Sequence, residues 1–122
     1  MPIDLTKLKA LELPTKEIEV DILGETQKAK ITAMSDSLSL DIVDIRNNNT
    51  VHEFEMRKLL LTKCAGMSDA DAELLCAREG AAAAKIISGI LDLTDEFDTA
   101  RAKLREEAKK KSNPVTTENM KN

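Results

Sequence analysis

The stretch from Gly80 to Lys111 carries the most sustained helical pattern in the chain. It contains no proline, and its apolar positions recur at intervals of three or four residues: Ile86, Ile87, Ile90, Leu91, Thr94, Phe97 and Leu104. This spacing places one apolar stripe along one side of a helix. Ala81 to Ala84 add almost no side-chain bulk, so a second helix can approach closely. The pattern predicts a long terminal helix that docks against another surface.

Two short segments nearer the start alternate between apolar and charged residues, as strands do. Glu17 to Leu23 alternates isoleucine or valine with acids, and Gln27 to Ala33 alternates alanine or isoleucine with lysine or threonine. The apolar row comprises Ile18, Val20, Ile22, Ala29, Ile31 and Ala33. Gly24 supplies a turn between the segments. Because opposite charges on neighbouring strands favour pairing, we expect an antiparallel hairpin whose acidic outer row faces a basic outer row.

The segment after the hairpin fits two structures. Leu38, Ile42 and Ile45 lie on one face of a helix that would run to residue 46, with capping oxygens just before it. Leu38, Leu40 and Ile42 also have the spacing of a strand. The pattern favours the helix and leaves the strand as the alternative.

Two further helices are expected before the long one. Thr50 and Glu53 form a capping box ahead of an apolar run that ends at Gly66, a residue that suits the left-handed end of a helix. Ser68 starts the next helix, and Gly80 either ends it or kinks it into the long helix. Together these elements predict an α+β fold, in which a short β-hairpin packs against a mostly helical domain with a long C-terminal helix.

The two ends of the chain differ from this middle. Residues 1–16 form a lead-in in which Asp4 can cap a short helix with three leucines on one side, closed by Pro14; an extended arm is the alternative. Residues 17–111 form a single α+β domain. Residues 112–122 are polar and contain a proline, so we expect a flexible tail.

Composition and charge narrow the range of functions. The 122 residues include 22 acidic and 18 basic side chains, and the net charge of −4 disfavours nucleic-acid and membrane-surface partners. The chain has no tryptophan or tyrosine with which to stack bases. The first ten residues lack the apolar core of a signal peptide, and no apolar run has the length of a membrane span. We therefore expect a cytoplasmic protein.

Candidate catalytic and metal-binding groups are sparse. His52 is the only histidine, so it cannot complete a metalloprotease pair on its helix. Asp69, Asp71 and Glu73 resemble the start of a calcium loop, but Leu74 stands where such a loop requires glycine. We interpret these acids as residues that favour the dipole at the start of a helix.

The two cysteines lie in helical apolar runs. Cys64 and Cys76 have no second cysteine or histidine near them, so we expect buried thiols and no zinc site. No glycine-rich loop follows a strand, which leaves nucleotide binding without support. The sequence therefore predicts neither an enzymatic activity nor a cofactor.

The order of these parts carries a resemblance to a known family. A leucine-bearing lead-in is followed by the charged hairpin EIEVDILGETQKAKITAMSD, a helical middle, and a terminal amphipathic helix, AAKIISGILDLTDEF, that continues into REEAKKKSN. In this layout the chain resembles the tail assembly chaperones of long-tailed bacteriophages. The resemblance covers roughly residues 1–113 and involves no invariant motif.

The resemblance implies partners and a place of action. Such chaperones are small, mostly helical and non-catalytic. They bind the tape-measure protein, keep it soluble, recruit the major tail protein before the tail polymerises, and are absent from the finished virion. The implied location is the host-cell cytoplasm. Many members also exist in a longer form made by a programmed frameshift, for which codons of Lys109 to Lys111 offer a candidate slippery site.

The predicted contact residues lie on the long helix. Ile86, Ile90, Leu93 and Phe97 share its apolar stripe, so each belongs either to the core or to a surface that binds a client or a second copy. The hairpin edges and the alanine face favour self-association. Two other functions stay open: a small tail structural or adaptor protein present in the virion, and a small helical regulator that acts through protein contacts.

Overall fold

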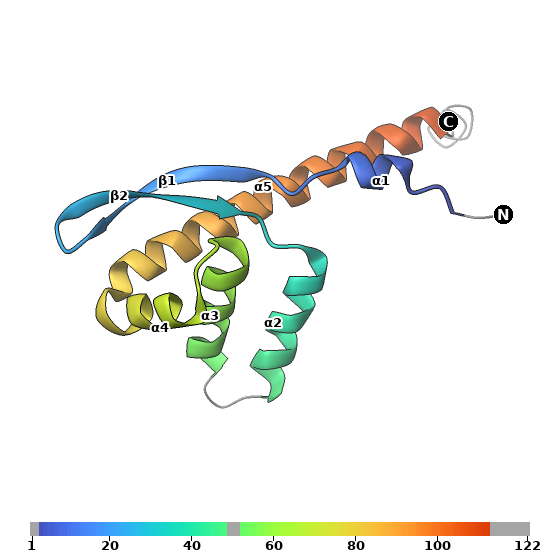
Figure 1. The fold of residues 1–122 in the computed structure, drawn as a ribbon. Coiled ribbons are helices and arrows are strands. Elements are labelled where there is room, and N and C mark those ends of the chain that lie inside the picture. The colour runs from blue at the N-terminus through green and yellow to red at the C-terminus, as the bar shows by residue number, and fades with distance from the viewer. Residues whose placement is uncertain (1–2, 49–51, 113–122) are drawn as a thin grey trace, which may run out of the picture.

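The computed structural model describes residues 3–48 and 52–112, and its elements confirm the predicted α+β class. Helix α1 (Thr6–Ala10) precedes strands β1 (Thr15–Ile22) and β2 (Glu25–Thr32). Four helices follow: α2 (Asp36–Asn48), α3 (His52–Cys64), α4 (Asp69–Arg78) and α5 (Gly80–Ser112). Figure 1 shows the hairpin lying along the beginning of α5, with helices α2, α3 and α4 gathered below. The capping residue Thr50 and the tail beyond residue 112 lie outside the described residues.

Strands β1 and β2 form the predicted antiparallel hairpin. Glu17 pairs with Lys30 and Glu19 with Lys28, so the acidic outer row faces the basic outer row as predicted. A diagonal contact brings Lys28 Nζ within 3.9 Å of Glu17 Oε1, and both side chains are exposed. Exposed ion pairs are weak, so these rows select the register of the strands more than they stabilise the fold.

The inner row of the hairpin packs onto α5. Val20 and Ile31 are fully buried and belong to one core cluster with Ile90 of α5. Gly89 permits the close approach, because a Cβ atom at this position would lie 3.0 Å from Ile31 Cδ1 and 3.2 Å from Ile18 Cδ1. An isolated two-stranded hairpin is marginally stable, so this contact with α5 is what holds the strands together.

The segment after the hairpin forms helix α2. Its apolar spacing allowed a helix or a strand, and the structure has the helix. Ser35 caps it: its Oγ accepts the Leu38 N–H at 3.1 Å, and its carbonyl oxygen accepts the Ser39 N–H at 3.0 Å. Leu38 is buried while Leu40 is exposed, whereas a strand would place both on one face. Helix α2 packs against α3.

Helices α3 and α4 fill the space beside α5. Helix α3 contacts α2, α4 and α5, and it buries Leu61 and Cys64. Gly66 follows α3 with a φ of 69°, the left-handed conformation expected at this helix end. The Oγ of Ser68 accepts the Asp71 N–H at 3.2 Å and caps α4.

Gly80 begins α5 as a separate helix. Helix α4 stops at Arg78, and Glu79, with φ of −143° and ψ of 63°, breaks the helical path between them. Helix α5 contacts α4, and within its alanine run Ala82 and Ala83 are buried while Ala81 and Ala84 are exposed. The close helix approach predicted for this run therefore occurs within the chain.

Helix α5 has two parts, which we call the packed segment (residues 80–101) and the projecting segment (residues 102–112). Arg101 marks the border. Its Nη1 and Nη2 donate to the two carboxylate oxygens of Asp36 at 2.9 and 3.1 Å, and its guanidinium lies 4.5 Å from the centre of the Phe97 ring. This clamp fastens α5 to the first residue of α2. Beyond it, residues 102–110 are all exposed.

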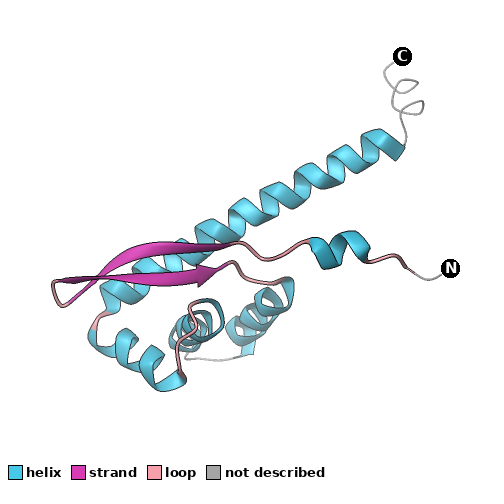
Figure 2. Cartoon of the chain, turned by 45° about the horizontal axis from the view of Figure 1, so that its top comes forward, coloured by secondary structure: helices cyan, strands magenta, loops and turns pink. Residues whose placement is uncertain are grey.

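The lead-in combines both of its predicted structures. Residues 6–10 form α1, and Asp4 Oδ1 accepts hydrogen bonds from the N–H and the hydroxyl of Thr6 at 3.0 and 2.6 Å. The next residues are extended, with Leu11 and Leu13 against the core. Helix α1 itself buries no residue. Figure 2 shows it beyond the end of the hairpin that lies opposite the turn.

Candidate protein-interaction surfaces

The four side chains predicted to contact a client or a second copy lie in the core. Ile86, Ile90, Leu93 and Phe97 are at most 9% exposed. The packed segment of α5 lies against both strands of the hairpin and against helices α3 and α4, which cover this stripe. All four side chains therefore belong to the core, and a surface that contacts other proteins must consist of other residues.

Large apolar side chains are exposed on several separate elements. They are Ile3, Leu5 and Leu8 in and around α1, Leu23 in the hairpin turn, Leu40 and Val43 on α2, Phe54 on α3, Leu74 on α4, and Leu91 and Leu104 on α5. Scattered exposed leucines are ordinary, so grouped ones are the informative case. Among the described residues, three groups occur: Ile3, Leu5 and Leu8 in and around α1, Leu23 with Leu74, which line one groove, and Leu40 with Val43 on α2.

An apolar groove lies between the hairpin turn and α4. We define it by its apolar lining, Ile22, Leu23, Met67, Leu74 and Leu75, and its polar lining, Gln27, Asp71, Arg78 and Glu79. Its volume is about 590 Å³. The thioether side chain of Met67 can adapt to different occupants. The lining carries two carboxylates, Asp71 and Glu79, and one guanidinium, Arg78, so its net charge is negative.

Leu23 occupies an unfavourable backbone position in this groove. Leu23 and Gly24 form a two-residue turn with positive φ at both residues, 52° and 83°, as a type I′ turn requires. This conformation costs a leucine about 1–2 kcal/mol. The side chain is 87% exposed, so no burial offsets the cost, while Glu79 Oε2 accepts the Leu23 N–H at 3.0 Å and holds the turn. A leucine directly before a turn glycine is the sequence signal for this position, which leaves a large apolar side chain exposed at the groove.

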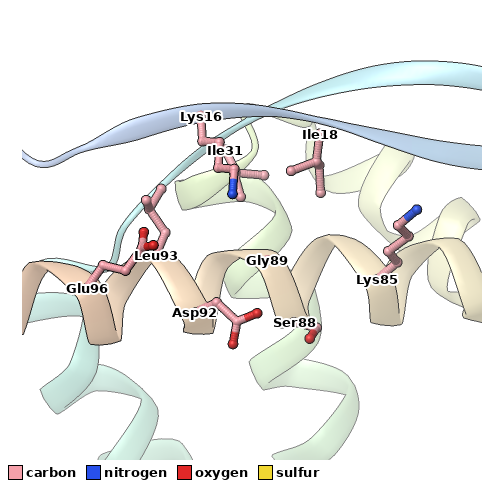
Figure 3. Close-up of a pocket in the computed structure, with 9 residues that line it drawn as sticks. All are labelled: Lys16, Ile18, Ile31, Lys85, Ser88, Gly89, Asp92, Leu93 and Glu96. Atoms are coloured by element: carbon pink, nitrogen blue, oxygen red, sulfur yellow. The ribbon is translucent and has the colours of Figure 1, made fainter.

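A second hollow lies between β1 and the side of α5 (Figure 3). Ile18 and Ile31 point down toward Gly89 and form its apolar floor. The rest of the lining is Lys16, Lys85, Ser88, Asp92, Leu93 and Glu96, and the volume is about 330 Å³. Among these described lining residues there is no histidine or cysteine, and the charges are of both signs. The lining charges therefore do not favour a ligand of one particular sign.

The two thiols are poor nucleophiles. Cys64 is buried as predicted, and burial raises the pKa of its thiol to about 11. Cys76 is half-buried, and burial raises the pKa of its thiol too, against the opposing effect of Arg57. Because the thiolate is the reactive and metal-binding form, a raised pKa lowers reactivity at neutral pH. Within residues 3–48 and 52–112, no three His, Cys, Asp or Glu side chains lie close enough together to hold a metal ion.

The acids that resemble the start of a calcium loop all lie on helix α4. Asp69 and Asp71 lie in its first turn, as predicted. Glu73 Oε1 accepts a hydrogen bond from Lys58 Nζ of α3 at 2.8 Å, which raises the pKa of Lys58. This pair joins α4 to α3. His52 begins α3, but its side chain lies outside the described part of the chain.

The exposed apolar groups are the candidates for contacts with other proteins. These groups lie around α1, on the outer side of α2 and around the groove. None of the described helices is long and apolar enough to cross a membrane. In comparisons with known proteins, no family model matches the chain, and neither a curated protein nor a solved structure matches it.

Proposed function

We propose that this chain is a tail assembly chaperone of a long-tailed bacteriophage. In this role it binds the tape-measure protein in the host cytoplasm, keeps it soluble and helps to recruit the major tail protein, without catalysing a reaction. Two features support the proposal. One is the ordered layout of lead-in, hairpin, helical middle and long terminal helix, and the other is the exposed apolar surface of a small domain.

The observation that carries the proposal is the outer side of α2, which we assign to the client. Leu40 and Val43 lie about one helical turn apart and are 70% and 50% exposed. Leu38 is buried in the core, so α2 is apolar both toward the domain and away from it. An apolar strip of this kind matches the apolar stripe of a second helix.

Charge helps to keep such a complex in solution. A long helical client exposes apolar stripes along its length and aggregates unless they are covered. Asp41 is exposed next to the strip on α2, and the chain carries a net charge of −4. Several copies bound along one client would add negative charge to it, and this charge opposes association between complexes.

Co-expression tests the proposal. The tape-measure protein that this proposal pairs with the chain is produced alone, with the wild-type chain, with a Leu40→Asp/Val43→Asp variant, or with Leu104→Asp as the control on another exposed leucine. We expect the wild type and Leu104→Asp to copurify with a soluble client. The double variant should stay folded by circular dichroism but let the client precipitate.

Two outcomes contradict the proposal. A client that is equally soluble without this chain, with no complex recovered, removes the need for a chaperone. Stoichiometric recovery of the chain from purified virions would instead indicate a structural subunit of the tail.

A further inference from the structure

We propose that α1 and the residues just before it dock in the apolar groove of a second copy, between the hairpin turn and α4 of that copy. The contact joins two unlike surfaces, so copies of the chain associate head to tail. It requires no tape-measure protein and therefore stands or falls separately from the function proposed above.

The arm, residues 3–10, is apolar and unpacked. Ile3, Leu5 and Leu8 are exposed, and α1 buries none of its residues. Leu5 and Leu8 are three residues apart, which places them on the same side of the helix. A five-residue helix is too short to be stable by itself in water. A surface that covers the leucines would stabilise the helix and remove their contact with water.

The groove is a surface that leucines fit. Leu23 lies on its hairpin side and Leu74 on its α4 side, both largely exposed, while Ile22, Met67 and Leu75 are partly buried. Leu23 keeps a strained conformation without covering anything in its own chain. An arm leucine inserted between Leu23 and Leu74 would bury apolar surface on both partners.

The charges of the two surfaces are complementary. Helix α1 carries Lys7 and Lys9 and no acidic residue, and these lysines flank Leu8 in the sequence. Asp4 lies just before the helix, so the arm as a whole has a net charge of +1. The groove lining carries Asp71 and Glu79 against Arg78 alone. Insertion of Leu8 would bring two ammonium groups to a lining of net negative charge, which orients the arm and favours encounter.

Leu8 cannot reach the groove of its own chain while α1 stays helical. Strand β1 has eight residues and therefore seven steps, so at about 3.3 Å per step its ends lie about 23 Å apart. The groove lies at the turn end of the hairpin, and the arm leaves from the opposite end (Figure 2). Folded back along the strand with α1 helical, the chain from Leu13 to Leu8 extends only about 15 Å. The occupant must therefore come from another copy.

Single substitutions test each surface. Leu8→Asp disables the arm and Leu74→Asp the groove, and Leu104→Asp is the matched control because Leu104 and Leu74 are 52% and 54% exposed. In sedimentation velocity from nanomolar to high micromolar concentration, wild type and Leu104→Asp should form species above the chain mass of 13.4 kDa. The other two variants should stay monomeric or associate at least about tenfold more weakly.

The turn supplies a variant that spares the fold. Leu23→Asn removes the leucine but keeps a residue that suits a positive φ. It should weaken association as Leu74→Asp does, with an unchanged circular dichroism spectrum. Association as strong as that of the wild type would contradict a role for Leu23 in the groove.

Mixing tests the head-to-tail geometry. Leu8→Asp keeps a groove and Leu74→Asp keeps an arm, so an equimolar mixture should form a heterodimer and no larger species, although neither variant associates alone. Three results would overturn the proposal. They are a wild-type chain that is monomeric throughout the concentration series, arm and groove variants that assemble like the wild type, and a mixture of monomeric variants that yields no heterodimer.

Discussion

The packed and projecting segments of α5 share one helical backbone and differ in their surroundings. The packed segment lies against the hairpin, α3 and α4 and buries Ile86, Ile90 and Phe97, whereas residues 102–110 are exposed throughout. Leu104 continues the apolar spacing seven residues after Phe97, yet it lies in solvent. An apolar stripe thus predicts a helix, but it does not indicate how many side chains of the stripe are buried. Their burial depends on where the elements that pack against the helix end.

The projecting segment is helical for local reasons. Glu106 and Lys110 are four residues apart with the acid first, which is the favourable order on a helix, and basic residues suit the end of the helix dipole. Extending an existing helix needs no new nucleus. The packed segment therefore supplies the nucleus, and the projecting segment continues it.

The largest difference between the segments should appear on truncating their leucine and isoleucine side chains. Ile90→Ala removes fully buried methyl groups and should lower the free energy of unfolding by about 2–5 kcal/mol. Leu104→Ala, on the projecting segment, should change it by no more than about 0.5 kcal/mol. Urea denaturation followed by circular dichroism measures both. Equal effects would show that the projecting segment is packed in solution.

A smaller effect is expected where α5 meets the strands. Gly89→Ala would place a Cβ atom 3.0 Å from Ile31 Cδ1, and the overpacking should outweigh the gain in helix propensity. We expect a net loss of about 1 kcal/mol in unfolding free energy. Gly80→Ala is the control, because a Cβ atom there meets nothing within 4 Å. A stabilised Gly89→Ala variant would mean that the hairpin adjusts its distance from α5.

The clamp at the border of the two segments should make stability depend on pH. Hydrogen bonds from Arg101 hold the pKa of Asp36 below its ordinary value of 3.8. A carboxyl group with a lowered folded-state pKa stabilises the fold above its unfolded pKa, and this contribution is lost as the pH falls through the folded-state pKa. Asp36→Asn should therefore be less stable than the wild type at neutral pH, by less than the core variants. The difference should shrink as the pH falls through the lowered folded-state pKa and disappear in strong acid.

Urea midpoints measured from pH 7 down into the acid range would check this. Asp95→Asn, which removes an exposed acid of the packed segment, serves as the control. A difference between the wild type and Asp36→Asn that stays constant into strong acid would contradict a stabilising role for the ionised pair.

The smallest effect is expected from removing the end of the projecting segment. A chain that stops after Arg105 loses no buried side chain among the described residues. Its free energy of unfolding should match that of the full chain, and only the helical circular dichroism signal should fall. A measurable loss of stability would place residues 106–122 against the domain.

The hairpin was the most predictable part of the fold, and the interaction surface the least. Alternating residues and the turn glycine specify the pairing of Glu17 with Lys30 because the two strands are neighbours in sequence. The helix at residues 36–48 was one of two options, and its capping by Ser35 and the burial of Leu38 decided it. The predicted contact residue Ile90 is in the core, while Leu23 shows its exposure and strain only once the turn is built.

Local patterns in the sequence specify most elements of this protein, because alternation, helical spacing, caps and turn glycines act over a few residues. Which apolar side chains are buried depends on the packing of elements that are distant in the sequence. Ile90 and Leu40 are both aliphatic residues on amphipathic helices, yet the first is buried and the second is exposed. The difference arises because side chains are buried by elements that are distant in the sequence. The hairpin packs on α5 and buries Ile90, whereas no described element of the same chain packs on the outer side of α2 or fills the groove beside Leu23.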